Sequence, residues 1–269
     1  MRLLYLSSKN AITGNAGSFE VPLVHTLSVA EGSRFRIDQL RLGVAFMLVN
    51  ENNRNLYFKE GNNVLWARLE IGQYDSQSLA TTLAFVLNAA SGLRGHFTCQ
   101  YSVVSACTVL TYTSPANEPF GTVSFLTDAQ LERDWVGNIS FPGNDLRNLR
   151  SFTTVLGGYI TSMSGHNTVL TFRFISMQPY DVLYLCSHRL GSTAIQGPRG
   201  NSDTLMQIVI NQPFGGIQEA SMPWDVWITC PGITCHRLDF QIQDAGGNVI
   251  DMSLGGEVSF LLSIDDGNS

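Results

Sequence analysis

The chain has 269 residues, of which 44% are hydrophobic and 14% are charged, and its formal net charge is −6. A chain of this length buries roughly three quarters of the surface that its unfolded form exposes, so it needs no disulfide or metal for stability. The negative charge argues against specific nucleic-acid binding, because there is no basic excess to displace counterions from phosphates. The longest apolar run, 44–49, is too short to cross a bilayer. We therefore expect a globular protein without a membrane span, synthesised in soluble form.

The last stretch of the chain carries the strongest strand pattern. Val258, Phe260, Leu262 and Ile264 alternate with more polar residues, which predicts a strand with one buried face. Such a strand is rarely left at an open edge, because unpaired amides beside an apolar face promote aggregation. We therefore expect this strand to lie inside a sheet, with the two ends of the chain close together. The alternating residues 238–243 and the turn signal at 244–248 predict a hairpin just before it.

The beginning of the chain reads differently. Residues 1–17 are polar and rich in turn signals, and we interpret them as an N-terminal arm. Pro22 places the first strand, 19–24, at an edge or at a position that needs no amide donor. In the longest strand candidate, 34–49, the apolar alternation changes phase near Asp38 and Gln39, which predicts a β-bulge.

Two helices are predicted by their spacing and caps. In the segment 76–90 one face is apolar, Asp75 or Ser76 can cap its start, and it should end near Ser91. Thr127 and Gln130 form a capping-box pattern that opens a short helix through Trp135. The segment 144–150 is a further short helical candidate.

The remaining apolar segments are short and rich in β-branched and aromatic residues, with turn signals between them. About ten such strands with two or three helices in the connections predict an all-β, antiparallel sandwich. We expect a single domain over 18–269, with a long elaborated connection at about 114–165. Long connections tend to be functional loops or subunit contacts, with disorder as the alternative.

Most catalytic and metal-binding sites have a characteristic sequence pattern. None of the five histidines is followed two places later by Asp or Glu, as the metal sites of cupins and iron oxygenases require. The most zinc-like set lacks a tight Cys-x2-Cys pair, so we interpret its cysteines as buried thiols. That set comprises Cys230, Cys235 and His236, with Cys186 and His188 as distant partners. Nucleophile-elbow, Walker and dinucleotide-binding patterns are missing too. We therefore expect no enzyme activity, cofactor or metal.

Several short motifs, in the same order along nearly the whole chain, resemble a known family. They are residues 5–14 (YLSSKNAITG), 18–23 (SFEVPL), 37–42 (IDQLRL), the helix 74–90, 156–158 (LGG), 184–191 (YLCSHRLG), 244–248 (DAGGN) and 258–260 (VSF). The chain resembles the minor capsid or penton proteins of virophages, polinton-like viruses and related double-stranded DNA viruses.

The resemblance implies a jelly-roll sandwich, with the last strand in the middle of a sheet beside the first. It also implies a structural protein of the virion, five copies of which form each icosahedral vertex. The partners would be sister copies, the major capsid protein and other minor capsid proteins. A vertex protein needs surfaces that close a ring and arms that reach neighbours. We expect those assembly contacts in the arm and the long loops, at Tyr5, Lys9, Asn10, Arg147 and Arg150.

A second function from another class is a viral spike or fibre module that binds a receptor or glycan. It would place aromatic and carboxylate side chains at one loop end. Trp224, Asp225 and Trp227 are the candidates for such a cluster. Trp224, Val226 and Ile228 alternate, however, and this predicts that Trp224 packs in the core.

Overall fold

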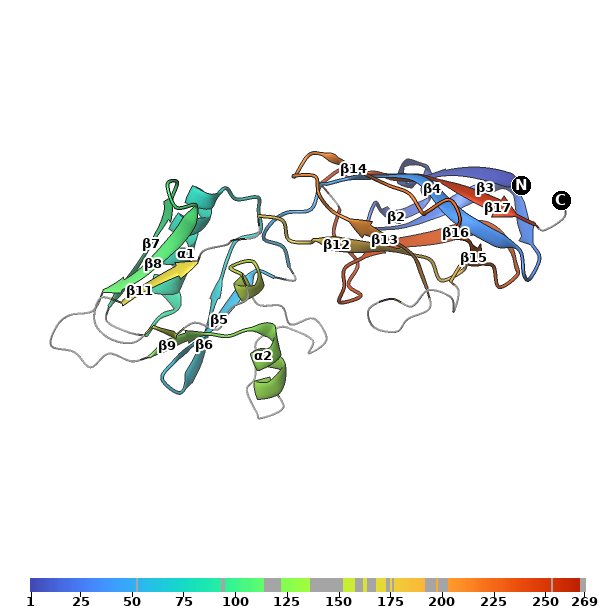
Figure 1. Ribbon diagram of the computed structural model, residues 1–269. Coiled ribbons are helices and arrows are strands. Elements are labelled where there is room, and N and C mark those ends of the chain that lie inside the picture. The colour runs from blue at the N-terminus through green and yellow to red at the C-terminus, as the bar shows by residue number, and fades with distance from the viewer. Residues whose placement is uncertain are drawn as a thin grey trace. The chain divides into compact units, whose positions relative to one another are not determined.

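The structure of the protein is a computed structural model (Figure 1), which describes residues 1–51, 53–92, 95–113, 122–135, 152–157, 162–163, 168–172, 175, 177–191, 197, 203–252 and 254–266. The chain divides into two compact units. The first joins Met1–Phe46 to Tyr180–Ser269, and the second is Met47–Pro179. We expected a single domain over 18–269, but each unit has a large apolar cluster of its own. The predicted helix at 144–150 lies outside the described residues.

The first unit is an antiparallel sandwich of two sheets. One sheet has the order β1-β17-β4-β14, with β15 also paired to β4, and the other has the order β13-β12-β16-β3-β2. The strands of the first sheet are β1 (Arg2–Ser7), β4 (Arg34–Gly43), β14 (Ile217–Ala220), β15 (Ile228–Thr229) and β17 (Val258–Asp265). Those of the second sheet are β2 (Thr13–Asn15), β3 (Ser18–Val29), β12 (Val182–Cys186), β13 (Thr204–Val209) and β16 (Ile233–Gln243). The expected all-β sandwich of jelly-roll type is thus confirmed.

The C-terminal strand β17 lies inside its sheet, as its apolar stripe predicts. It pairs with β1 on one side, from Arg2↔Ile264 to Ser7↔Ser259, and with β4 on the other. In Figure 1 β17 runs alongside β4. Phe260 on β17 meets Phe240 on β16 edge to face, with ring centroids 4.9 Å apart. Since these two strands belong to opposite sheets, their rings join the two layers of the core.

Strand β4 contains the predicted bulge. Its register against β17 shifts between Ser259↔Arg41 and Leu261↔Asp38, so β4 carries one extra residue there. Gln39 takes up the difference in a left-handed conformation, with φ +49°. The bulge lets Ile37 before it and Leu40 after it both point into the core, where both are fully buried.

The N-terminal segment differs from the expected arm. Arg2–Ser7 forms strand β1 in the sheet, and Thr13–Asn15 forms β2, which pairs with β3 in the other sheet. The reason is a short strand pattern, in which buried and outward-facing side chains alternate. This pattern is hard to recognise in the sequence because polar residues follow it directly. Leu4 and Leu6 pack against the core while Leu3 and Tyr5 face outward. Residues 1–17 therefore contribute to the sandwich itself.

The second unit contains two smaller sheets and the two predicted helices. One sheet has the order β10-β9-β5-β6 and the other β11-β8-β7. Their strands are β5 (Asn55–Glu60), β6 (Asn63–Arg68), β7 (His96–Ser102), β8 (Cys107–Thr113), β9 (Val123–Phe125), β10 (Ser162–Met163) and β11 (Thr168–Phe172). Aromatic pairs contribute to the core of this unit, among them Phe58 with Phe125 and Phe97 with Tyr112.

Both helices begin at the caps that the sequence predicts. In α1 (Ser76–Ala90) the Asp75 carboxylate accepts from the Ser78 amide at 2.7 Å, and the Ser78 hydroxyl accepts from the Asp75 amide at 3.1 Å. In α2 (Asp128–Trp135) the Thr127 amide donates to the Gln130 side chain at 2.9 Å. The buried face of α1 contacts β7, so the helix packs in the second unit.

Candidate functional site

The His, Cys, Asp and Glu side chains of the described residues are the candidates for catalysis or metal binding. No group of three or more His, Cys, Asp or Glu side chains there is arranged to hold a metal ion. The five cysteines are free and buried. Burial raises the pKa of Cys99 and of Cys186 to about 12, so these thiols stay protonated at neutral pH. Protonated thiols are poor nucleophiles and poor metal ligands.

The residues of the zinc-like set instead have separate partners. Cys186 on β12 lies 3.8 Å from the Thr204 hydroxyl, and His188 lies 3.3 Å from the Asp203 carboxylate. His236 faces the Thr26 hydroxyl across the neighbouring strand at 3.1 Å. The set is therefore spread over several strands rather than gathered around one point.

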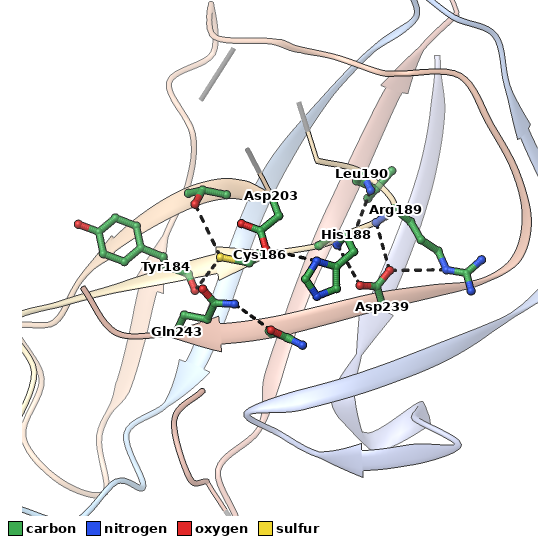
Figure 2. A network of polar contacts seen from close by, with 11 residues as sticks. Tyr184, Cys186, His188, Arg189, Leu190, Asp203, Asp239 and Gln243 are labelled. Atoms are coloured by element: carbon green, nitrogen blue, oxygen red, sulfur yellow. Dashed lines mark hydrogen bonds and ion pairs between the residues drawn. The ribbon is translucent and has the colours of Figure 1, made fainter. Parts of the chain in front are cut away.

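The motif 184–191 forms a strand end followed by a turn that one carboxylate holds (Figure 2). Asp239 on β16 accepts from the backbone amide of His188 at 2.9 Å and from that of Arg189 at 3.3 Å. The Ser187 hydroxyl accepts from the Leu190 amide at 3.2 Å, and Leu190 is buried in the core. The polar residues of this motif thus satisfy the amides of a tight turn, so their role is structural.

Arg189 also joins a charge network on the outer face of the second sheet. Its guanidinium lies 3.6 Å from Asp239 and 3.8 Å from Glu20, and Arg237 reaches the same Glu20 at 3.5 Å. These pairs link β3, β16 and the turn that follows β12. Because these pairs are partly exposed, each contributes little to stability, but together they fix the turn against the sheet.

The predicted assembly residues of the N-terminal segment lie on or directly after the edge strand β1. The Tyr5 side chain is 68% exposed and points away from the core. The Lys9 ammonium lies 2.7 Å from Glu257, which also accepts from the Ser7 hydroxyl at 3.1 Å. This arrangement lowers the pKa of Glu257 and raises that of Lys9, in each case chiefly through their shared hydrogen bond. Asn10 is exposed.

The structure therefore places Tyr5 on the edge strand β1, and Lys9 and Asn10 in the single helical turn that follows it, Ser8–Asn10. Arg147 and Arg150, the other two predicted contacts, lie outside the described residues.

Trp224, Asp225 and Trp227 are the residues that would favour a recognition module, and the position of Trp224 differs from our expectation. Trp224 is 81% exposed, so the prediction that it packs in the core is wrong. The reason is a turn at Trp224 and Asp225, which interrupts the alternation that a strand would have imposed. The guanidinium groups of Arg34 and Arg36 lie 5.6 and 5.0 Å from the Trp227 ring, and Arg36 donates to the Trp224 carbonyl at 2.8 Å.

Sequence reasoning missed a polar cluster on the outer face of the first sheet. Arg36 and Asp38 form an ion pair at 3.1 Å, and the Ser263 hydroxyl donates to Asp38 at 2.6 Å. The signal was present in the sequence, because Arg34, Arg36 and Asp38 alternate with the buried Phe35 and Ile37. Only the pairing of β4 with β17 shows that Ser263 completes the cluster.

Among the solved structures that resemble this chain are two that match it over nearly its full length. The chain is similar to the mavirus penton protein, with a TM-score of 0.48 and 12% identity over 98% of this chain and 99% of that one. It is also similar to a chain from the structure of the Sputnik virophage, with a TM-score of 0.43 and 12% identity over 98% of each chain. No protein-family model and no curated protein matches the sequence. No described helix is both long and apolar enough to span a membrane.

Proposed function

We propose that this chain is a structural capsid protein, and that five copies of it form the penton at the vertices of an icosahedral double-stranded DNA virus. It would then reside in the virion capsid, beside the major capsid protein and other minor capsid proteins. The observation that carries the proposal is the position of β17, which is paired on both sides between β1 and β4. The resemblance in the sequence implies this arrangement, and the alternation in β17 predicts an interior strand independently.

The positions of the resembling motifs give further support. Residues 18–23 lie in β3, 37–42 lie in β4 across the bulge, and 258–260 begin β17. Residues 184–191 form the end of β12 and the turn that Asp239 holds. These four motifs thus lie at a bulge, at a turn or at the start of a strand of the sandwich, which is what a shared architecture would preserve.

A vertex protein also needs a rigid body and two different surfaces, because a ring of five closes only through heterologous contacts. The first unit supplies the rigid body, with β1 and β4 fixed to β17 by two ladders and by ion pairs at the strand ends. The exposed Tyr5 on β1 is one point at which a neighbouring copy could dock.

The oligomeric state of the purified full chain tests the proposal. Mass photometry and light scattering should give five times the chain mass of 29.5 kDa. Mixing with the major capsid protein should then give shells with this chain at the vertices, as seen by electron microscopy. A trimer would favour a spike or capsomer, and a stable monomer would favour a cement or binding role.

One observation favours the recognition module as a second candidate. Trp224 and Asp225 are both exposed at a turn, as a receptor- or glycan-binding loop would require. A glycan array with the intact protein separates the two functions. Binding that is lost in Trp224→Ala, in a protein that does not assemble, would replace the penton proposal.

A further inference from the structure

The outer face of the first sheet combines exposed apolar side chains with a centre that carries paired charges. Leu3 and Tyr5 on β1 are 55% and 68% exposed, and cross-strand pairing places them in rows with Ser263 and Leu261. At the other edge of the sheet, Ile217 on β14 is 53% exposed. Aromatic and large apolar residues at both margins of one face are typical of an interface.

The charges of this face are already neutralised within it. Arg36 pairs with Asp38, Arg41 with Glu219 at 3.2 Å, and Arg34 with Asp265 at 2.8 Å. Covering the face would therefore leave none of these charges without a partner, which is the usual cost of burying an ionic surface. The surface that docks here therefore needs no net charge of its own. We expect it to carry apolar side chains and uncharged polar side chains.

Trp224 lies beside the same face. Its carbonyl accepts from Arg36, whose guanidinium also lies over the Trp227 ring, so the segment that carries Trp224 is fixed to the sheet. The Trp224 side chain is nevertheless exposed. Trp, Tyr and Arg are the residues that most often dominate binding energy at protein interfaces.

We propose that this face is one of the two surfaces through which sister copies of this chain close their ring, with Tyr5 and Trp224 as its anchors. The proposal rests on the proposed function and identifies which surface of the sandwich performs it. Strand spacings give a face about 19 Å wide and, along β4, about 30 Å long, which is at most roughly 600 Å² before relief is counted. That is of the order of the ~800 Å² per partner that a stable interface buries.

Charge-introducing variants of the full chain test the proposal. Tyr5→Glu and Trp224→Glu should each raise the concentration at which the oligomer dissociates by about tenfold or more, and the double variant should be monomeric. Phe85→Glu is the matched control, because Phe85 is equally exposed but lies on α1 in the second unit. It should assemble like the wild type. Far-ultraviolet circular dichroism and thermal melting establish that each variant is folded.

A second measurement needs no variant. Hydrogen–deuterium exchange of the wild type, compared above and below its assembly concentration, should show new protection in residues 1–7 and 217–227. An assembled double variant with an unchanged dissociation concentration would overturn the inference while leaving the penton proposal intact. The inference would also be overturned if Phe85→Glu raised the dissociation concentration as much as Tyr5→Glu and Trp224→Glu do. Protection from exchange confined to other segments would overturn it too. A monomeric wild type at all concentrations would contradict both proposals.

Discussion

Arg2 and Asp266 lie 264 positions apart in the sequence and form a two-point ion pair. Nε of Arg2 donates to Oδ2 of Asp266 at 2.9 Å, and Nη2 donates to Oδ1 at 2.5 Å. The pair lies where the β1–β17 ladder begins, at Arg2↔Ile264. It fixes the end of β1 to the end of β17, so the N-terminal residues are part of the folded body.

Removing residues 1–7 should therefore destabilise the first unit. The deletion removes the buried Leu6 side chain and leaves β17 as an open edge. Loss of one buried leucine costs about 2–5 kcal/mol, and the exposed edge should promote aggregation. Urea unfolding followed by circular dichroism measures the loss. Arg2→Ala is the mild control, since a partly exposed ion pair contributes about 1 kcal/mol or less. A truncated protein as stable as the wild type would restore the arm interpretation.

Replacing Gln39 by glycine should stabilise the protein. Gln39 has φ +49°, a left-handed conformation that a side chain disfavours and glycine adopts freely. We expect the free energy of unfolding to rise by up to about 1 kcal/mol. Gln207→Gly is the control, because Gln207 is an exposed residue in the regular strand β13, where glycine should be unfavourable. A loss of stability in Gln39→Gly equal to that of the control would show that the bulge needs the Gln39 side chain.

The Lys9–Glu257 pair should make stability depend on pH at both ends of the range. The folded-state pKa of Glu257 is lowered, so its contribution is present above its ordinary pKa of 4.5 and is lost as the pH falls through the lower folded value. The folded-state pKa of Lys9 is raised, so its contribution is present below its ordinary pKa of 10.5 and is lost at higher pH.

The difference in unfolding free energy between the wild type and Lys9→Met should therefore be largest between these limits and should shrink outside them. Chemical denaturation across pH measures it. A difference that stays constant below pH 4.5 would mean that Lys9 acts through packing instead.

The buried thiols should resist modification in the folded protein. With a pKa of about 12, Cys99 and Cys186 are thiolates in only about one molecule in ten thousand at pH 8. Alkylation followed by peptide mass mapping should leave both unmodified in native buffer and modify both in concentrated urea. Rapid native modification of Cys186 would indicate that the turn after β12 opens readily.

Local signals in the sequence predicted those elements whose geometry is decided by neighbouring residues. The caps at Asp75 and Thr127, the phase change at Gln39 and the stripe of β17 each depend on a few adjacent positions, and the structure has them all. The division into two units depends instead on which core a segment joins. Phe46 belongs to one core and Leu48 to the other, yet both lie in one apolar run.

The candidate interface was only partly predictable from the sequence, because it too depends on contacts between segments that are far apart in the chain. The sequence predicts Tyr5 as a contact residue, but its place on a paired strand depends on partners that lie more than 250 positions away. The exposure of Trp224 depends on a turn that an alternating sequence conceals. The pairing of Asp38 with Ser263 is likewise invisible until β4 and β17 are placed side by side.

The interior position of β17 also sets the order of events during synthesis. The second unit is one continuous stretch of chain and can fold as soon as it leaves the ribosome. Strands β1 and β4 are made early but have no strand between them until residues 258–265 emerge. A nascent chain must therefore keep the apolar faces of β1 and β4 from aggregating until residues 258–265 have been made, and termination before that point would release a sandwich with open edges.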